Sequence, residues 1–191
     1  AGNSTSDGGA MRIRDTQVVQ IKGCEVTQTL RGIRIQQASR GIISNCRTHL
    51  TVESGVYLAS SDYAYTNACN NFLVTGCIVE DAMNNGILVI GGSNNSVIGN
   101  QVIGSANAGI QCWSVKDVCI KSNKLHNCNR LAHNGIGSDG DAWGNIVVDG
   151  NTSVPDEAGY LADISDNSLY NCNQGRQSSV IGVNIRSDTY P

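Results

Sequence analysis

Apolar, mostly β-branched residues recur along the chain at intervals of roughly 23 residues. One column of such residues is Ile21, Ile43, Val74, Val97, Ile120, Val148 and Ile164. Three residues after each member stands a second column, Cys24, Cys46, Cys77, Asn100, Asn123, Asn151 and Asn167. Two residues further on comes a third column, Val26, Thr48, Val79, Val102, Leu125, Ser153 and Leu169. Because side chains alternate between the two faces of a strand, each repeat predicts two short strands joined by a turn at the Cys or Asn.

A glycine followed by an apolar residue indicates a third strand in each repeat. These glycines are Gly32, Gly55, Gly86, Gly109, Gly135, Gly159 and Gly182. One repeat cannot bury its own apolar face, whereas stacked repeats bury a continuous core. The sequence therefore predicts an all-β fold, a parallel solenoid of about seven to eight coils. We expect the solenoid to occupy residues 15–191, after a flexible leader at 1–14, and the chain to be a piece of a longer protein.

The pattern resembles the right-handed parallel β-helix family, which includes pectate lyases, polygalacturonases, alginate epimerases and bacteriophage tailspikes. Ladders of stacked Asn side chains are a habit of that family, and Asn100, Asn123 and Asn151 fit one. The Asp-Asp, Gly-His-Gly and Arg-Ile-Lys signatures of polygalacturonases are absent from the sequence. With its many Gly, Asn and Ser residues, the chain is most similar to tailspikes. That resemblance implies a homotrimer that binds, and often cleaves, bacterial surface polysaccharide.

The eight cysteines fit the same repeat. No CxxC pair and no Cys/His cluster with zinc-ligand spacing is present. Cys24, Cys46 and Cys77 occupy the turn column, and Cys128 and Cys172 share a position five residues after Asn123 and Asn167. We interpret all eight as small apolar free thiols. A disulfide between stacked coils is the alternative interpretation.

The strand after each glycine has an outward side, predicted to form a strip along the solenoid. Its second-position column is Arg34, Tyr57, Leu88, Gln111, Gly137, Leu161 and Asn184. Its fourth-position column is Gln36, Ala59, Ile90, Trp113, Asp139, Asp163 and Arg186. An indole beside carboxylates and amides suits sugar binding, because the ring stacks on the sugar and the polar groups bond its hydroxyls.

Three acids are therefore candidate catalytic residues, namely Asp139, Asp163 and Asp141. Asp139 and Asp163 are expected one coil apart, about 5 Å by strand spacing, which suits a retaining glycosidase. The candidate substrate-binding residues are Trp113, Tyr57, Gln111, Arg186, Tyr63 and Tyr65, the last two in an inserted loop around residues 60–68.

Each of these residues also has a plainer interpretation. The Ser-Asp-Gly-Asp sequence around Asp139 and Asp141 is typical of a turn. Trp113 can pack against the inserted loop or a neighbouring subunit. Leu88 and Ile90 favour a subunit interface or a loop-covered patch. No complete oxygen-ligand spacing for Ca²⁺ is visible, so we expect neither a metal nor a cofactor.

Charge and hydropathy narrow the function. A net charge of −3 with 15% charged residues argues against nucleic-acid binding, and no apolar run is long enough for membrane insertion. The leading hypothesis is a tailspike-type depolymerase that acts on O-antigen, capsule or exopolysaccharide. It would be assembled in the host cytoplasm and exposed on the virion tail; a secreted protein is the alternative. The alternatives for function are a non-catalytic glycan-binding or structural trimer, and a polysaccharide lyase or epimerase.

Overall fold

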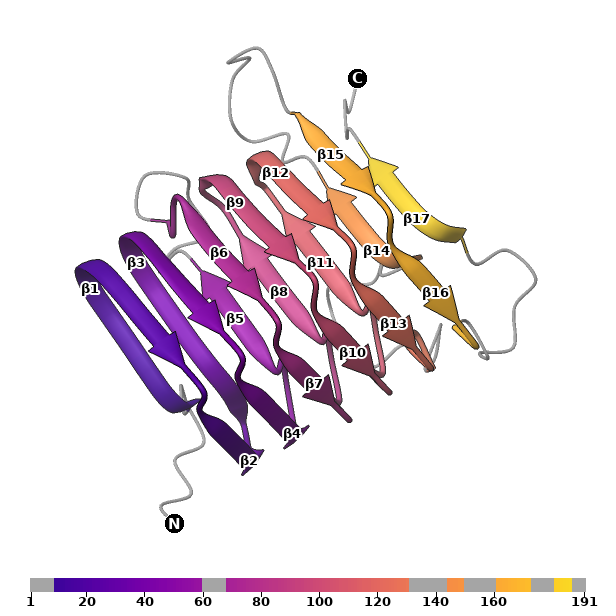
Figure 1. The fold of residues 1–191 in the computed structure, drawn as a ribbon, viewed down its shortest axis with the longest axis horizontal. Coiled ribbons are helices and arrows are strands. Elements are labelled where there is room, and N and C mark those ends of the chain that lie inside the picture. The colour runs from indigo at the N-terminus through magenta and orange to yellow at the C-terminus, as the bar shows by residue number, and fades with distance from the viewer. Residues whose placement is uncertain (1–8, 60–67, 131–143, 150–160, 173–180, 187–191) are drawn as a thin grey trace.

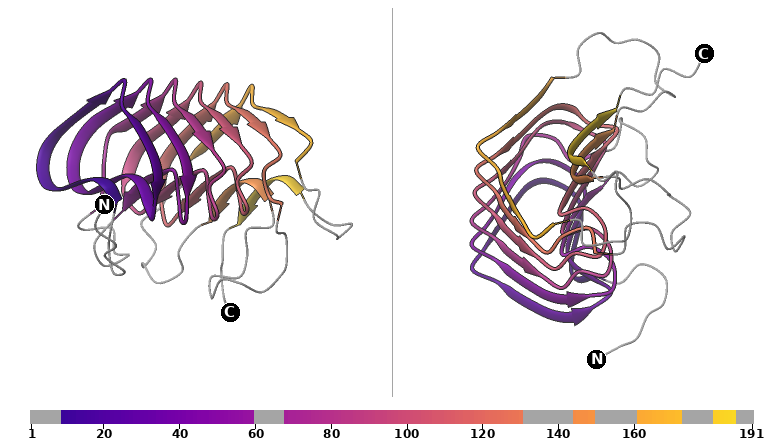
Figure 2. Two further views of the ribbon diagram at one scale, coloured as in Figure 1. Left: turned by 90° about the horizontal axis from the view of Figure 1, so that it is seen from below. Right: turned by 90° about the vertical axis from the view of Figure 1, so that its right-hand side faces the viewer.

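The protein is a stack of parallel coils, as a computed structural model shows (Figures 1 and 2). The structure describes residues 9–59, 68–130, 144–149, 161–172 and 181–186, and all elements in these ranges are β-strands. Within them, no helix of the length and apolarity that a bilayer crossing requires is found. Seen end-on in Figure 2, each coil bends around the core, which gives the solenoid three faces.

Two long strands, β1 (Gly9–Lys22) and β3 (Arg31–Ser44), each cover the first and second faces at the N-terminal end. The first face continues with β5 (Val56–Ala59), β8 (Ile87–Ile90), β11 (Ile110–Trp113), β14 (Gly144–Asp149) and β17 (Ile181–Arg186). The second face continues with β6 (Phe72–Thr75), β9 (Ser93–Ile98), β12 (Lys116–Lys121) and β15 (Ala162–Ser165). The third face consists of β2 (Glu25–Thr29), β4 (Arg47–Thr51), β7 (Ile78–Glu80), β10 (Gln101–Ile103), β13 (Lys124–His126) and β16 (Ser168–Tyr170).

In-register pairing stacks equivalent side chains into the core. On the first face, one inward column is wholly buried and consists of Ile33, Val56, Ile87, Ile110 and Ile146. The second face contributes Ile43, Val74, Val97 and Ile120, also without exposure. Burial of each such side chain contributes about 1.5–3 kcal/mol, and the column repeats this gain in every coil.

The turn between the second and third faces is held by a ladder of asparagines. Asn100 Oδ1 accepts the Cys77 N–H at 3.0 Å, and Asn100 Nδ2 donates to Val74 O at 2.9 Å and to Asn123 Oδ1 at 3.0 Å. Asn123 repeats the arrangement one coil later, with Asn167 Oδ1 as acceptor at 2.9 Å. Because these amides are buried, the ladder satisfies turn backbone that would otherwise lack partners.

Glycines open the first-face strands because the coils approach closely there. A Cβ on Gly86 would lie 2.3 Å from Val102 Cγ1 and 2.6 Å from Gly109 O. A Cβ on Gly32 would lie 2.2 Å from Gly55 O. Neither glycine has a positive φ, so crowding between coils, and not a left-handed backbone, excludes a side chain.

The predicted parallel β-helix is confirmed, but the repeat was assigned wrongly after Asn123. The next member of the ladder is Asn167, and Asn151 lies outside the described residues. Val148 belongs to the first face, where it pairs with Cys112. The first-face strand after β11 is β14, whose Asn145 takes the position assigned to Gly135, which is also outside the described residues.

The N-terminal boundary also differs from the prediction. Strand β1 begins at Gly9, and its residues pair with β3 from Gly9 onward. Residues 9–14, assigned by the sequence to the leader, therefore form the start of the first coil.

Candidate functional site

The outward strip of the first face combines cationic, aromatic and amide side chains. By the strand register, one column is Arg12, Arg34, Tyr57, Leu88, Gln111, Val147 and Asn184. The other column includes Arg14, Gln36 and Ala59 at its N-terminal end, and Ile90, Trp113, Asp149 and Arg186 further along. We call these two columns the outward strip. In-register stacking brings residues far apart in sequence to about 4.8 Å from one another along it.

Two guanidinium groups lie over the ring of Tyr57 on this strip. Arg31 Cζ is 5.0 Å and Arg34 Cζ 5.4 Å from the centroid of its ring. Glu53 forms an ion pair with Arg31, which fixes that side chain at the first residue of β3. Both Tyr57 and Arg34 are 6% exposed, so the two cation–π contacts lie largely out of water, where they are strongest.

Beyond Tyr57 the strip becomes apolar. Tyr57, Ala59, Leu88 and Ile90 form a cluster separate from the core, and Trp113 packs against it. Leu88 is 9% and Ile90 3% exposed in the single chain. The apolar patch expected at these positions is therefore covered without any neighbouring subunit.

Amide groups lie beside the aromatic residues. Asn85 Nδ2 donates to Gln111 Oε1 at 2.9 Å. Among the described residues, Oδ1 of Asn85 and Oε1 of Gln36 are buried acceptors with no hydrogen-bond partner. Gln111 and Trp113 themselves are half-buried. Gln111 and Trp113 are thus the members of this part that a ligand can reach, and they offer an amide and an indole ring.

The N-terminal end of the strip is exposed and cationic. Arg12 and Arg14 lie on β1, and both are exposed. Arg14 Nε donates to Gln37 Oε1 at 3.1 Å and lies 3.2 Å from an oxygen of Asp15. With Arg31 and Arg34, four arginines gather within the first two coils.

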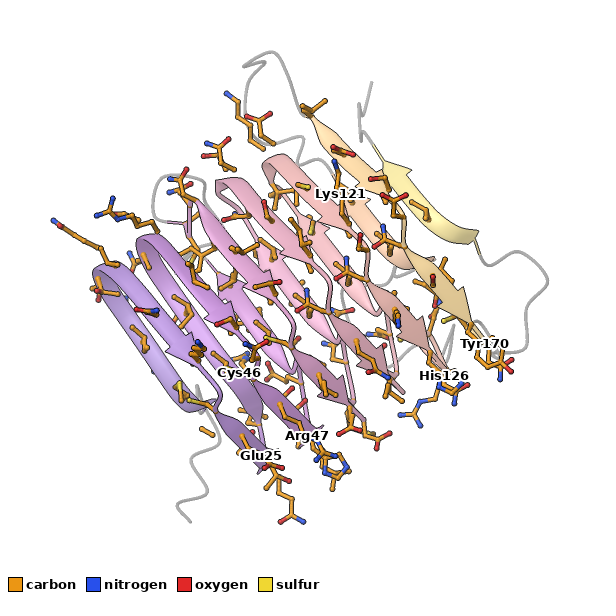
Figure 3. All side chains as sticks on the ribbon, in the orientation of Figure 1. Glu25, Cys46, Arg47, Lys121, His126 and Tyr170 are labelled. Carbon is orange, nitrogen blue, oxygen red and sulfur yellow. The ribbon has the colours of Figure 1, made fainter. Side chains whose placement is uncertain are left out.

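The structure places Asp163 on a face other than that of the outward strip. Asp163 pairs with Cys119 on the second face and forms an ion pair with Lys121, which raises the pKa of that lysine (Figure 3 labels Lys121). The expectation that Asp163 lies in the Trp113 column is therefore wrong. Leu161, expected on the strip, precedes β15 on the second face, where its carbonyl accepts the Val118 N–H.

The other predicted site residues either lie on the outward strip or fall outside the described residues. Tyr57, Gln111 and Trp113 lie on the strip as expected, and the backbone of Arg186 pairs with Asp149 at its C-terminal end. The predicted residues Asp139, Asp141, Tyr63 and Tyr65 lie outside the described residues, and so does Gly137.

Sequence reasoning missed Asp149 and the arginines of the first two coils as site residues. By the strand register, Asp149 occupies the position assigned to Asp139, and its signal was the apolar run Ile-Val-Val, which follows Asn145 and not the usual glycine. Arg12 was hidden in the supposed leader. Arg31 precedes the glycine column, so alternation alone does not place it against Tyr57.

A second cluster of charges lies on the third face, around the labelled Glu25 and Arg47 in Figure 3. Arg47 bonds Glu80 at 2.7 Å and lies 3.8 Å from Glu25, and the hydrogen bond to Glu80 raises the pKa of Arg47. His49 lies 3.6 Å from Asp81. The pairs of Arg47 with Glu80 and Glu25 lie near the surface and across coils, so they contribute little free energy and partly neutralise one another.

Comparison with known proteins gives one family. A family model described as a right handed beta helix region matches residues 2–114, which is more than half of the chain. No curated protein matches the chain. A solved structure that it resembles is an alginate lyase from Paenibacillus sp. str. FPU-7, with 14% identity and a TM-score of 0.47 over 97% of this chain and 77% of that one.

Proposed function

Because the chain belongs to the family of right-handed β-helix regions, we propose that it binds an acidic polysaccharide along the outward strip. The observation that carries this proposal is the gathering of four arginines at one end of the strip, two of them the exposed Arg12 and Arg14, in a protein whose net charge is −3. A local cationic surface on a negative protein attracts an anionic ligand to one place.

The rest of the strip suits the neutral parts of a sugar polymer. Gln111 and Trp113 lie four coils from Arg12 and Arg14, about 19 Å along the solenoid. An indole can stack on a pyranose ring, while the amide accepts hydroxyl protons. A face that repeats with each coil also matches a ligand that repeats with each sugar unit.

Titration of the purified protein with polyuronate, acidic bacterial capsules and a neutral glucan tests binding. We expect the acidic polymers to bind and the neutral glucan to bind weakly or not at all. Arg12→Gln and Arg14→Gln should each weaken binding about 5-fold, because one exposed charge contact contributes about 1 kcal/mol. Lys124→Gln, an exposed charge removed from the third face, is the matched control. Equal effects at all three positions would contradict the strip as the binding site.

A second candidate function is cleavage of the same polymer by β-elimination. The observation that favours it is that the guanidiniums of Arg31 and Arg34 lie over the ring of Tyr57. In an elimination, the Tyr57 phenolate would take the proton from the carbon next to a uronate carboxylate, whose charge the arginines would neutralise. The phenol so formed would pass that proton to the glycosidic oxygen as its bond to carbon breaks, and a double bond conjugated to the carboxylate would form.

Absorbance and reducing ends distinguish the chemistries in one incubation. Elimination produces shorter chains that absorb in the ultraviolet, and Tyr57→Phe should abolish them while binding persists, because the ring is kept and only the hydroxyl is lost. New reducing ends without that absorbance would instead support the glycosidase hypothesis with Asp139 and Asp141. Binding without any shortening would leave a recognition module.

A bacteriophage tail is the biological setting that we propose for this binding, with bacterial O-antigen, capsule or exopolysaccharide as the polymer. The homotrimer, the location on the virion and the secreted alternative stay predictions. Screening the acidic capsules and O-antigens of several bacterial hosts would support the setting if one of them binds far more tightly than polyuronate.

A further inference from the structure

Two thiols are stacked at the C-terminal end of the third face. Cys128 and Cys172 each follow their strand by two residues, after His126 of β13 and Tyr170 of β16. These strand ends are paired, with ring centroids 5.1 Å apart, and Figure 3 shows the two labelled rings side by side. The Asn127 N–H donates to Tyr170 O at 3.1 Å, so the pairing continues beyond the strands toward the thiols.

The sulfur contacts show that the two cysteines occupy equivalent positions in successive coils. Cys128 Sγ donates to Val102 O at 3.5 Å, and Cys172 Sγ donates to Leu125 O at 3.4 Å. Val102 and Leu125 are themselves paired residues of β10 and β13. The two thiols are therefore neighbours in successive coils.

The two thiols differ in exposure and acidity. Cys128 is fully buried, whereas Cys172 is half-buried. The hydrogen bond from Cys128 lowers the pKa of Cys172, and the same interaction together with burial raises the pKa of Cys128. Cys172 is therefore the accessible and more nucleophilic member, with Cys128 directly behind it.

We propose that Cys128 and Cys172 form a reversible disulfide that fastens the two stacked coils of β13 and β16 together. Equivalent positions in neighbouring parallel strands are about 4.8 Å apart, within the range of about 4.4–6.8 Å between Cα atoms that a disulfide spans. The inference stands independently of the polysaccharide proposal.

Glutathione disulfide is the oxidant that balances the reaction. The Cys172 thiolate attacks one sulfur of glutathione disulfide, so that one glutathione thiolate leaves and a mixed disulfide forms. The Cys128 sulfur then attacks the Cys172 sulfur, its proton passes to the departing glutathione, and the second glutathione is released. Two protein thiols are oxidised and one glutathione disulfide is reduced to two glutathiones.

The position of the pair gives the bond a mechanical role. Strand β16 is exposed at every residue and, among the described strands, pairs with β13 alone. Leu169, an inward residue of the third column, is 36% exposed, and Tyr170 is 65% exposed. A covalent link between the two positions would join β13 and β16 in addition to their hydrogen bonds.

Cys46 and Cys77 provide an internal comparison, because they are also stacked in successive coils, where the Ile78 N–H donates to Cys46 O. They are 2% and 1% exposed, and burial raises the pKa of Cys77 to about 11. Both pairs are thus stacked. Of the two pairs, only Cys128 and Cys172 include a thiol, that of Cys172, which is accessible to solvent and has a lowered pKa. We expect Cys46 and Cys77 to stay reduced.

The test incubates the reduced, folded protein in glutathione buffers of increasing oxidised fraction, followed by acid quenching, alkylation in denaturant and peptide mapping. We expect one intramolecular bond, a mass loss of about 2 Da and a linked Cys128–Cys172 peptide. Cys172→Ser should abolish the bond, and Cys46→Ser should leave it unchanged. In the wild type, native alkylation of Cys172 should be at least about tenfold faster than that of Cys77.

Four results would overturn the proposal. They are complete alkylation of all cysteines in the most oxidising buffer, a bond between Cys46 and Cys77, an intermolecular bond, or a glutathione adduct on Cys172 that never closes. If Cys172→Ser does not fold, peptide mapping and native alkylation of the wild type decide the matter, because neither needs a variant.

Discussion

Asn100 connects two neighbouring coils through a single buried side chain. Its amide satisfies the Cys77 N–H and the Val74 carbonyl and continues to Asn123. A buried backbone group without a hydrogen-bond partner costs about 1–3 kcal/mol. Removal of the Asn100 side chain is therefore costly because it leaves such groups without partners. The sequence identified this ladder because an amide is the side chain that can donate and accept at the same turn in every coil.

Asn100→Ala should lower the free energy of unfolding by about 3 kcal/mol, because it leaves two buried backbone groups without partners. Urea denaturation measures this loss. Gln101→Ala, at the next and exposed position, should change stability by less than about 0.5 kcal/mol. Similar midpoints for the two variants would mean that water replaces the amide.

The site residues were less predictable than the ladder at this scale. Tyr57, Gln111 and Trp113 follow from alternation after a glycine, and the structure places them on the strip. The contact of Arg31 with Tyr57 does not follow from alternation, since it depends on the ion pair with Glu53 and on stacking across coils.

At the scale of the elements, close approach between coils decides where glycine is required. The first-face strands begin where the backbone of one coil meets side chains of the third face, as Gly86 does with Val102. Gly23, at the turn before β2, has the opposite character, with φ +66° and no atom within 4 Å of the place that a Cβ would take. Glycine is thus required at Gly86 because there is no room for a side chain, and at Gly23 because the backbone is left-handed.

Gly86→Ala should lower stability by about 3 kcal/mol, since its Cβ would overlap the Gly109 carbonyl and the Val102 side chain. Gly23→Ala should cost about 1 kcal/mol, the penalty of a left-handed backbone with a side chain. Thermal denaturation of the two variants compares them directly. A larger loss for Gly23→Ala would show that the coils separate easily at Gly86.

At the scale of the whole molecule, the apolar part of the outward strip is buried within a single chain. Leu88 and Ile90 were the reason for expecting a trimer, and both are covered in the single chain. The trimer therefore rests on the resemblance to tailspikes and no longer on an exposed apolar patch.

Light scattering of the purified chain measures its mass in solution. A trimer of the 20.2 kDa chain would support the tailspike setting through contacts other than Leu88 and Ile90. A monomer would agree with their burial and would count against the trimer for this part of the protein. Polysaccharide binding by the strip is expected in either case, because every residue named for it lies on one chain.

The sequence by itself determined the solenoid, its inward columns and its asparagine ladder. Each coil must bury apolar side chains at the same places as its neighbours, and such repetition is visible wherever the spacing stays near 23 residues. It also located the outward positions of the coils up to Trp113.

Only the tertiary structure decided how the coils after Trp113 are arranged. After Trp113 the interval between repeats departs from 23 residues. Several glycines and asparagines then fit the next glycine or asparagine position of the repeat, and the local sequence pattern does not distinguish among them. In the structure, Asn123 is hydrogen-bonded to Asn167 of the next coil, and strand pairing places Asp149 beside Trp113. The same arrangement places Asp163 on the second face, opposite Cys119, because stacking, and not sequence distance, sets which side chains meet.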